Sequence, residues 1–371
     1  MDKNTETADS KTLTFSFING AETGDAMKEQ ESAKKKLSKF EKYLPLWIGI
    51  CMVLGIILSQ LVPSISEAID SWQISGISVP IGICLFLMMY PAMLGVQSSE
   101  LKKLRKNPKP IILTLVSNWL VAPTVGFVLA WTFLPGNEQL IVAVILLSSS
   151  PCTAMVLVWG YLAEGNQEQN VVNTTLNTIT ILVLFVPLVA LFTGISNIPI
   201  DRILLVISVL VFIGVPLLLG IASRRVLVSR KGMDWFQNKY RPAAGNLALI
   251  ALLTTLIVLF SLNGTVMLEQ TDLLVLVSIP LLLGFAIVVA YNLIITRAAK
   301  LAYGEATITV IIGSSSHFEI AIATAVSMYG VGSIAALGTT MGLFWEVPIM
   351  LGLVYLAKYL RKRNFWKGEQ M

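Results

Sequence analysis

Long apolar runs constrain this chain more than any other feature of its sequence. Runs of about twenty apolar residues, enough to cross a hydrocarbon layer of roughly 30 Å at about 1.5 Å per residue, recur from Tyr43 to the C-terminus. Only 13% of the 371 residues are charged, against roughly 25% in an average soluble domain. The sequence therefore predicts an all-α integral membrane protein.

Ten apolar segments are expected to form transmembrane helices, preceded by a polar tail. The tail, residues 1–42, is rich in Lys, Glu, Ser and Thr, and we expect it to be mostly disordered and cytoplasmic. The ten-helix domain is expected over residues 43–363. Its segments lie at 43–62, 77–96, 111–134, 139–162, 171–194, 202–222, 245–263, 273–295, 305–329 and 333–358.

The distribution of positive charge predicts the topology. All but one of the 27 Lys and Arg residues fall in the two tails and in the second, sixth and eighth connections, and the exception is Arg202. Cytoplasmic loops carry the excess of Lys and Arg, so both termini are expected in the cytoplasm of a cell-membrane protein. Because the net charge of +5 follows this topology, it does not indicate a nucleic-acid partner.

The two halves of the chain resemble each other. Residues 43–194 superimpose on residues 202–358 with a shift of about 160 to 168 residues, and Ser148–Cys152 then matches the segment that begins at Ser314. Because five spans is an odd number, the two halves must have opposite orientations in the membrane. This pattern predicts two inverted five-helix repeats, the plan of secondary transporters, with discontinuous fourth and ninth helices.

The two matching serine-rich stretches are expected to be helix breaks. Proline removes a backbone donor, serine hydroxyls compete for backbone hydrogen bonds, and lipid cannot satisfy the groups that are freed. A single break of this kind is commonly a kink that improves packing. Paired breaks in corresponding spans instead favour a binding site.

Glu319 and Glu346 are the only carboxyl groups expected deep within spans. Ionisable residues at membrane depth are costly and usually functional, so both are candidate proton carriers. The alternative is a hydrogen-bonded structural role. For Glu346, the neighbouring Trp345 and Pro348 make a role in helix packing an equal alternative.

Cys152 is the candidate ligand for a soft solute. It follows the helix-breaking Pro151, and we expect it at the exposed start of a half-helix, where the positive end of the helix dipole would face the sulfur. A deprotonated thiol suits arsenic(III), antimony(III) or copper(I) and suits sodium or magnesium poorly. Cys51 and Cys84 lack this context and are expected to be packing residues.

His317, the only histidine, lies two residues before Glu319. This spacing is too short for two metal ligands on one helix face, so a zinc site is disfavoured, while a role in tuning a proton step stays open. The chain has neither a P-loop nor a dinucleotide-binding glycine pattern, so we expect no cofactor.

Four stretches resemble the arsenite permeases of the arsenical-compound-resistance family, type three. They are Met88–Pro91, Pro151–Trp159, His317–Ala325 and Glu346–Pro348, and the resemblance extends from about Phe40 to Arg363. It implies the ten-span fold of the bile acid, arsenite and riboflavin transporter superfamily, with transport driven by proton antiport.

The resemblance also implies roles for particular residues. The family cysteine that matches Cys152 is required for metalloid transport, and the glutamate that matches Glu319 is implicated in it. Positions matching Asn118, Trp159, Asn177 and Glu346 are also linked to transport, and we expect Ser316 at the second break to contribute to substrate binding. Relatives commonly carry Asn and Phe where this chain has Ser316 and His317.

The leading hypothesis is therefore export of arsenite, with antimonite and organic arsenicals open, in exchange for protons. Its partners would be these small solutes and the lipid bilayer. A sodium-coupled importer of an organic anion on the same fold is the first alternative. An intramembrane enzyme using Cys152 and His317 is disfavoured, because no third group is evident to orient the histidine.

Overall fold

The computed structural model describes residues 43–62, 72–74, 77–95, 107–330 and 332–366. The predicted tail, residues 1–42, lies outside the described residues. The chain divides into two units, Met1–Leu46 and Trp47–Met371, and the second contains nearly all of the described residues.

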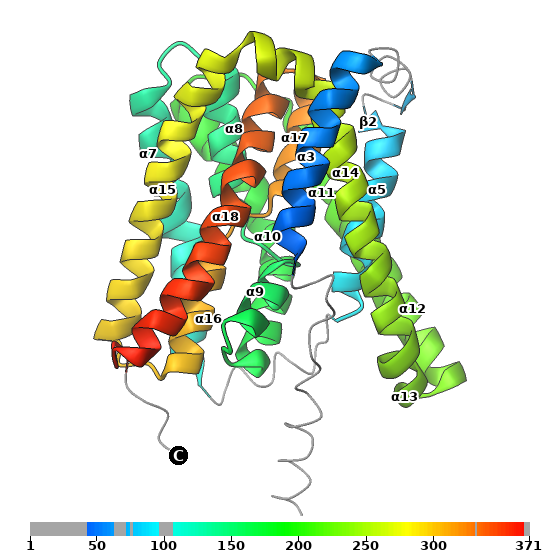
Figure 1. The fold of residues 1–371 in the computed structure, drawn as a ribbon, viewed down its shortest axis with the longest axis vertical. Helices are drawn as coiled ribbons and strands as arrows, with labels where there is room; N and C mark the ends of the chain where they lie inside the picture. The colour runs from blue at the N-terminus through cyan, green and yellow to red at the C-terminus, as the bar shows by residue number, and fades with distance from the viewer. Residues whose placement is uncertain (1–42, 63–71, 75–76, 96–106, 331, 367–371) are drawn as a thin grey trace, which may run out of the picture. The chain divides into compact units, whose positions relative to one another are not determined.

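Helices account for almost all of this second unit (Figure 1). Within the described ranges the strands are β1 (Gln73–Ile74) and β2 (Ile77–Ser78), which form one short antiparallel pair and modify the all-α prediction only slightly. The helices are α3 (Leu44–Leu61), α5 (Val79–Met93), α6 (Pro108–Val116), η2 (Ser117–Val121), α7 (Ala122–Phe133), α8 (Glu138–Ser148), α9 (Val156–Leu162), α10 (Gln167–Ile195), α11 (Arg202–Val209), η3 (Leu210–Gly214), α12 (Val215–Lys231), α13 (Met233–Trp235), η4 (Phe236–Tyr240), α14 (Arg241–Glu269), α15 (Thr271–Ala298), α16 (Tyr303–Gly313), α17 (Phe318–Tyr329) and α18 (Ile334–Lys362).

Helix length and composition agree with a multi-pass membrane protein. Six helical stretches of the described chain are long and apolar enough to cross a membrane, and shorter apolar helices include α8 and α17. The 11 residues of α8 reach only about 17 Å, roughly half of a hydrocarbon layer. The chain must therefore continue through its break into α9 to reach the other side. The six long stretches are Pro108–Phe133, Gln167–Ile195, Arg202–Lys231, Met233–Thr265, Thr271–Ala298 and Ile334–Lys362.

Three of the long helical stretches contain a π-helical turn just before a proline. The turn η2 precedes Pro123 of α7, η3 precedes Pro216 of α12, and η4 precedes Pro242 of α14. A proline ring clashes with the carbonyl four residues earlier and donates no hydrogen bond to it, and a wider π turn relieves this clash without ending the helix. All three stretches therefore remain continuous.

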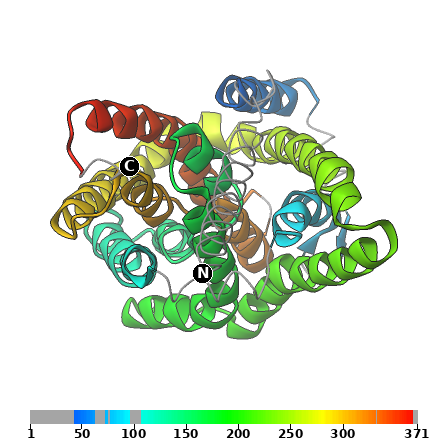
Figure 2. The same ribbon diagram turned by 90° about the horizontal axis from the view of Figure 1, so that it is seen from below.

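The helices of the second unit pack in two groups. In one group, α12 and α14 both pack against α5. In the other, α7 packs against α8 and α15, while α18 packs against α8, α15 and α17. Figure 2 shows the second group from below, with α18 beside α15. The contacts of α11 with α10 and α17 join the two groups.

A glycine allows the close approach of α7 to α8. A Cβ at Gly126 would overlap the Cβ and Oγ of Ser148, which backbone geometry holds in place. We expect Gly126→Ala to lower the free energy of unfolding by about 1–3 kcal/mol, the usual effect of overpacking. The measurement is the thermal unfolding of the detergent-purified protein. Gly194→Ala on α10 is the matched control, because nothing lies within 4 Å of a Cβ there; equal melting temperatures for the two variants would contradict the close contact.

The connection from residue 224 to residue 241, predicted as a loop, is helical instead. Helix α12 continues to Lys231, and Gly232, at φ 83°, makes the turn into α13. The prediction was wrong because charged residues end an apolar run but do not end a helix. No glycine or proline interrupts α12 between Gly220 and Gly232.

An ion-pair cluster joins the turn after α9 to the end of α18. Glu164 lies 3.0 Å from Lys358 Nζ and 3.1 Å from Arg361 Nη1. The hydrogen bond from Lys358 is the main reason that the pKa of Glu164 is lowered, so its stabilisation is present at neutral pH and is lost as the pH falls below its ordinary value of 4.5.

We therefore expect Glu164→Gln to destabilise the protein at pH 7 by less than about 1 kcal/mol, because all three side chains are well exposed and solvent screens them. The difference from the unmutated protein should disappear near pH 3. Melting temperatures at the two pH values test this, and a difference that persisted at the lower pH would contradict it.

Candidate functional site

The first helix break separates α8 from α9. Ser149 to Met155 lie between the two helices, and the Ser150 hydroxyl donates to the Leu146 carbonyl at 2.8 Å. Pro151 has no N–H to continue the α8 ladder. The interruption predicted here is therefore present, and it is longer than a proline kink.

The second break separates α16 from α17 and covers Ser314 to His317. His317 caps α17: its backbone is non-helical, and its Nδ1 accepts from the Ile320 amide at 3.3 Å. Because the capping residue lies outside the helical conformation, its side chain folds back over the first turn.

The two breaks meet. Pro151 and Ser316 form an isolated antiparallel bridge, and the Cys152 amide donates to the Ser315 carbonyl at 3.4 Å. Figure 1 shows α8 and α17 in the upper half of the view and α9 and α16 in the lower half, so the interrupted helices run in opposite directions. Each break thus supplies partners for backbone groups that the other leaves free, as non-helical backbone away from water requires.

Cys152 lies at the centre of this crossing but not where the sequence predicted. Its side chain is fully buried, and α9 begins only at Val156. The expectation of an exposed thiol at a helix start was wrong, because Pro151 and Cys152 pair with the other break and a bend and a turn separate them from α9.

Asn177 and Asn118 support the backbone at Cys152. Asn177 Nδ2 donates to the Cys152 carbonyl, and its Oδ1 accepts from Asn118 Nδ2, each at 3.1 Å. Both residues are buried, and they come from α10 and η2. Trp159 is also buried, on α9, but among the described residues no hydrogen bond joins its side chain to this cluster.

Glu346 of α18 binds the second break through both carboxylate oxygens. Oε1 accepts from the Ser315 hydroxyl at 2.6 Å and from the Ser316 amide at 3.1 Å, while Oε2 accepts from the Ser316 hydroxyl at 2.5 Å. The carboxyl group is 3% exposed. The sequence indicated that Glu346 lies deep in a span. It did not indicate that its carboxylate binds the second break.

Glu319 lies against His317. Glu319 Oε2 is 3.0 Å from His317 Nδ1, and the two side chains are 2% and 1% exposed. No described donor meets either Glu319 oxygen with full hydrogen-bonding geometry, and His317 Nε2 is likewise unpaired. Nδ1 has a single position for a hydrogen, so it either accepts from the Ile320 amide or shares a proton with Glu319, and the two contacts compete.

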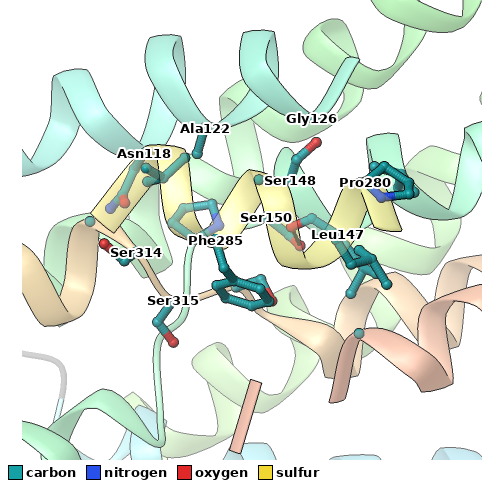
Figure 3. Close-up of a pocket in the computed structure, with 18 residues that line it drawn as sticks. Asn118, Ala122, Gly126, Leu147, Ser148, Ser150, Pro280, Phe285, Ser314 and Ser315 are labelled. Atoms are coloured by element: carbon teal, nitrogen blue, oxygen red, sulfur yellow. Dashed lines mark hydrogen bonds between the residues drawn. The ribbon is translucent and has the colours of Figure 1, made fainter. Parts of the chain in front are cut away.

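A cavity of about 70 Å³ lies on one side of the crossing, between α7, α8, α15 and the second break (Figure 3). It has room for roughly five waters. Asn118 and Ser316 line it together with Ser148 and Ser314, but Cys152 and Glu319 do not. This cavity is therefore lined by neither the sulfur nor the carboxyl group of the two leading candidate residues. Both groups are buried beside the cavity instead.

Sequence reasoning missed one polar group at this site. Asn292 of α15 donates to the hydroxyls of Ser117, at 2.8 Å, and of Ser314, at 3.1 Å. Its Oδ1 is buried without a partner among the described residues. A lone asparagine in an otherwise apolar span was the signal that could have identified it.

Comparisons with known proteins give a consistent result. Residues 82–270 match the model of the Sodium Bile acid symporter family. The chain is 34% identical over 340 residues to the arsenical-resistance protein Acr3 of Alkaliphilus metalliredigens, covering 88% of this chain and 94% of the relative. It is 32% identical over 339 residues to Acr3 of Corynebacterium glutamicum, covering 89% and 92%. An uncharacterized transporter of Synechocystis is 39% identical over 349 residues, covering 89% and 90%.

Proposed function

The chain belongs to the sodium bile acid symporter family of membrane transporters, and on this basis we propose that it exports arsenite from the cytoplasm in exchange for protons. The buried thiol at the crossing of two broken helices carries the proposal. Two relatives that match this chain over nearly their whole length are named as arsenical-resistance proteins. Cys152 supplies the soft ligand that arsenic(III) prefers.

The membrane arrangement we propose has ten spans in two inverted repeats, residues 43–194 and 202–358. The antiparallel pairing of the two breaks supports it, because equivalent segments of oppositely oriented repeats meet in this way. The asymmetry of Lys and Arg supports a cell-membrane location with both termini in the cytoplasm.

The binding step we propose conserves all atoms. Arsenite enters as the neutral trihydroxide, the Cys152 sulfur forms a bond to arsenic, and one hydroxide leaves with the thiol proton as water. Asn118 and Asn177 hold the Cys152 backbone, and Ser316 and Trp159 complete the surroundings of the solute. A single thiol suits a carrier, because three thiolates would bind the metalloid too tightly to release it.

A conformational change must accompany binding and release. Cys152 is 0% exposed in this conformation, so a solute reaches the sulfur only after the two groups of helices move relative to each other. Glu319 is the first candidate to carry the proton that resets the site, since it shares a proton-dependent contact with His317. Glu346 is the second.

Sodium-coupled import of an organic anion is the alternative. The family name and the oxygen-rich crossing favour it, because hydroxyl and amide oxygens such as those of Ser314 and Asn118 are the ligands that hard cations prefer.

One experiment separates the two functions. Everted vesicles containing the protein are loaded with radioactive arsenite from outside, with an imposed pH gradient, with a sodium gradient, and with neither. We expect the pH gradient alone to drive accumulation. Accumulation driven only by sodium, or the absence of any arsenite uptake, would contradict the proposed function.

A further inference from the structure

We propose that the cavity beside the crossing is a hydrogen-bonding subsite for an undissociated metalloid trihydroxide, with Asn118 Oδ1 as its acceptor and the Ser314 hydroxyl as its donor. This inference rests on the proposed function, because it adds a docking place to the same transport path. The two side chains come from η2 and from the second break, and both line the cavity of about 70 Å³ (Figure 3). A trihydroxide has four heavy atoms, fewer than the roughly five waters that this volume can hold.

The acceptor is fixed by a series of hydrogen bonds that begins at a backbone carbonyl. A carbonyl oxygen only accepts, so Asn177 must turn its Nδ2 towards the Cys152 carbonyl, at 3.1 Å. Asn177 Oδ1 then accepts from Asn118 Nδ2, also at 3.1 Å. This leaves Asn118 Oδ1 without a donor among the described residues. Unlike Asn292 Oδ1, this oxygen is not enclosed by protein, so it faces the cavity that Asn118 lines.

The donor is fixed in the same way from the other side of the cavity. The Ser117 hydroxyl donates to the Gly313 carbonyl at 2.8 Å, so its one proton is committed. Asn292 must therefore present its Nδ2 to the oxygens of Ser117 and Ser314, at 2.8 and 3.1 Å. The Ser314 oxygen accepts this bond, while its own proton meets no acceptor among the described residues. The Ser314 hydroxyl can thus donate to a solute in the cavity that it lines.

An acceptor and a donor on the walls of one cavity determine the chemistry of its occupant. One hydroxyl group of a trihydroxide can donate to Asn118, and the oxygen of a second can accept from Ser314. The neutral molecule also brings no charge that a buried site would have to compensate. A sodium ion fits less well, because no acidic residue lines the cavity and the Ser314 proton would face the cation.

The cavity lies next to the proposed metalloid ligand without including it. Pro151 lines the cavity, whereas Cys152, the next residue, does not and is fully buried. A solute held by the two hydrogen bonds is therefore close to the sulfur before any bond to arsenic forms, which raises its effective concentration there. Because these bonds form before the exchange at sulfur, we expect their loss to change the KM for arsenite and not the maximal rate.

The test is competition by boric acid in everted vesicles. Boric acid is a neutral trihydroxide at neutral pH and forms no lasting bond with a thiol, so it can occupy the subsite without reacting with Cys152. We expect it to inhibit arsenite uptake competitively. Ser314→Ala should raise the KM for arsenite about tenfold, the equivalent of one hydrogen bond, and weaken inhibition by boric acid by the same factor. The maximal rate should stay within about twofold. Ser314→Thr, which keeps the hydroxyl, should restore both values.

Ser327→Ala is the matched control, because Ser327 is a buried serine of α17 that does not line the cavity. Its KM for arsenite and its inhibition by boric acid should equal those of the unmutated protein. An unchanged KM in Ser314→Ala, failure of Ser314→Thr to restore it, or an equal effect of Ser327→Ala would each overturn the subsite.

The remaining outcomes distinguish failure of the subsite from failure of the proposed function. Uptake of arsenite without competition by boric acid would refute the subsite and leave the proposed function standing. If replacing choline chloride by sodium chloride lowers the KM only when Ser314 is intact, the cavity is a cation site and the inference is overturned. If the unmutated protein takes up no arsenite, the proposed function fails and the inference falls with it.

Discussion

Everted vesicles containing Cys152→Ala accumulate no arsenite above the level of vesicles without the protein. The reason is chemical: in the described chain this is the only thiol at the crossing of the two breaks, and neither serine nor asparagine oxygen replaces a thiolate for arsenic(III). Cys152→Ser should fail as well, although it retains hydrogen-bonding capacity. Comparing the two variants separates the need for sulfur from the need for packing.

Cys51→Ala and Cys84→Ala are the controls for this prediction. Both cysteines lie on other helices, α3 and α5, and we interpret them as packing residues. We expect vesicles with either variant to retain most of the uptake once the amount of protein is equalised by immunoblotting. Unchanged arsenite accumulation by Cys152→Ala would rule out the ligand role, and with it the main argument for a metalloid substrate.

The helix breaks could be predicted from sequence because their causes are local. A proline after three serines cannot continue an apolar helix at low cost, and the matching serines near residue 315 repeat the signal at the equivalent place. The ten apolar segments follow equally from hydropathy, and each of them contains helix where the structure describes it.

The partners across the breaks could not be predicted, because they depend on the packing of distant elements. Glu346 is 31 residues from Ser315, and no periodicity relates the two. Cys152 illustrates the same limit. A local argument placed it at a helix start, whereas Pro151 and Cys152 pair with the second break and α9 begins only at Val156, after a bend and a turn.

His317 shows that a residue at a helix N-cap can contact the side chain two positions later. On a regular helix, residues two apart point in different directions, so spacing alone does not predict a contact between His317 and Glu319. The structure places His317 at the N-cap, outside the helical conformation, and its ring turns back to within 3.0 Å of the carboxyl group. The candidate proton carrier therefore has a ring nitrogen beside it.

The second large effect is expected at Glu319. In vesicles with Glu319→Gln, an imposed pH gradient should no longer stimulate arsenite accumulation, so the ratio of uptake with and without the gradient falls to about one. A carboxamide cannot take up or release the proton that the Glu319 and His317 contact requires, although it has nearly the same shape.

Binding should survive the Glu319→Gln change, because the sulfur and the asparagines that hold the Cys152 backbone are untouched. Protection of Cys152 from maleimide labelling by arsenite measures this separately from transport. Glu269→Gln, at the exposed end of α14, is the control for loss of a carboxyl group elsewhere. If Glu319→Gln kept its full response to the gradient, the proton would have to travel by another group. Glu346 would be the next candidate, and it would then have to release its serine donors in every cycle.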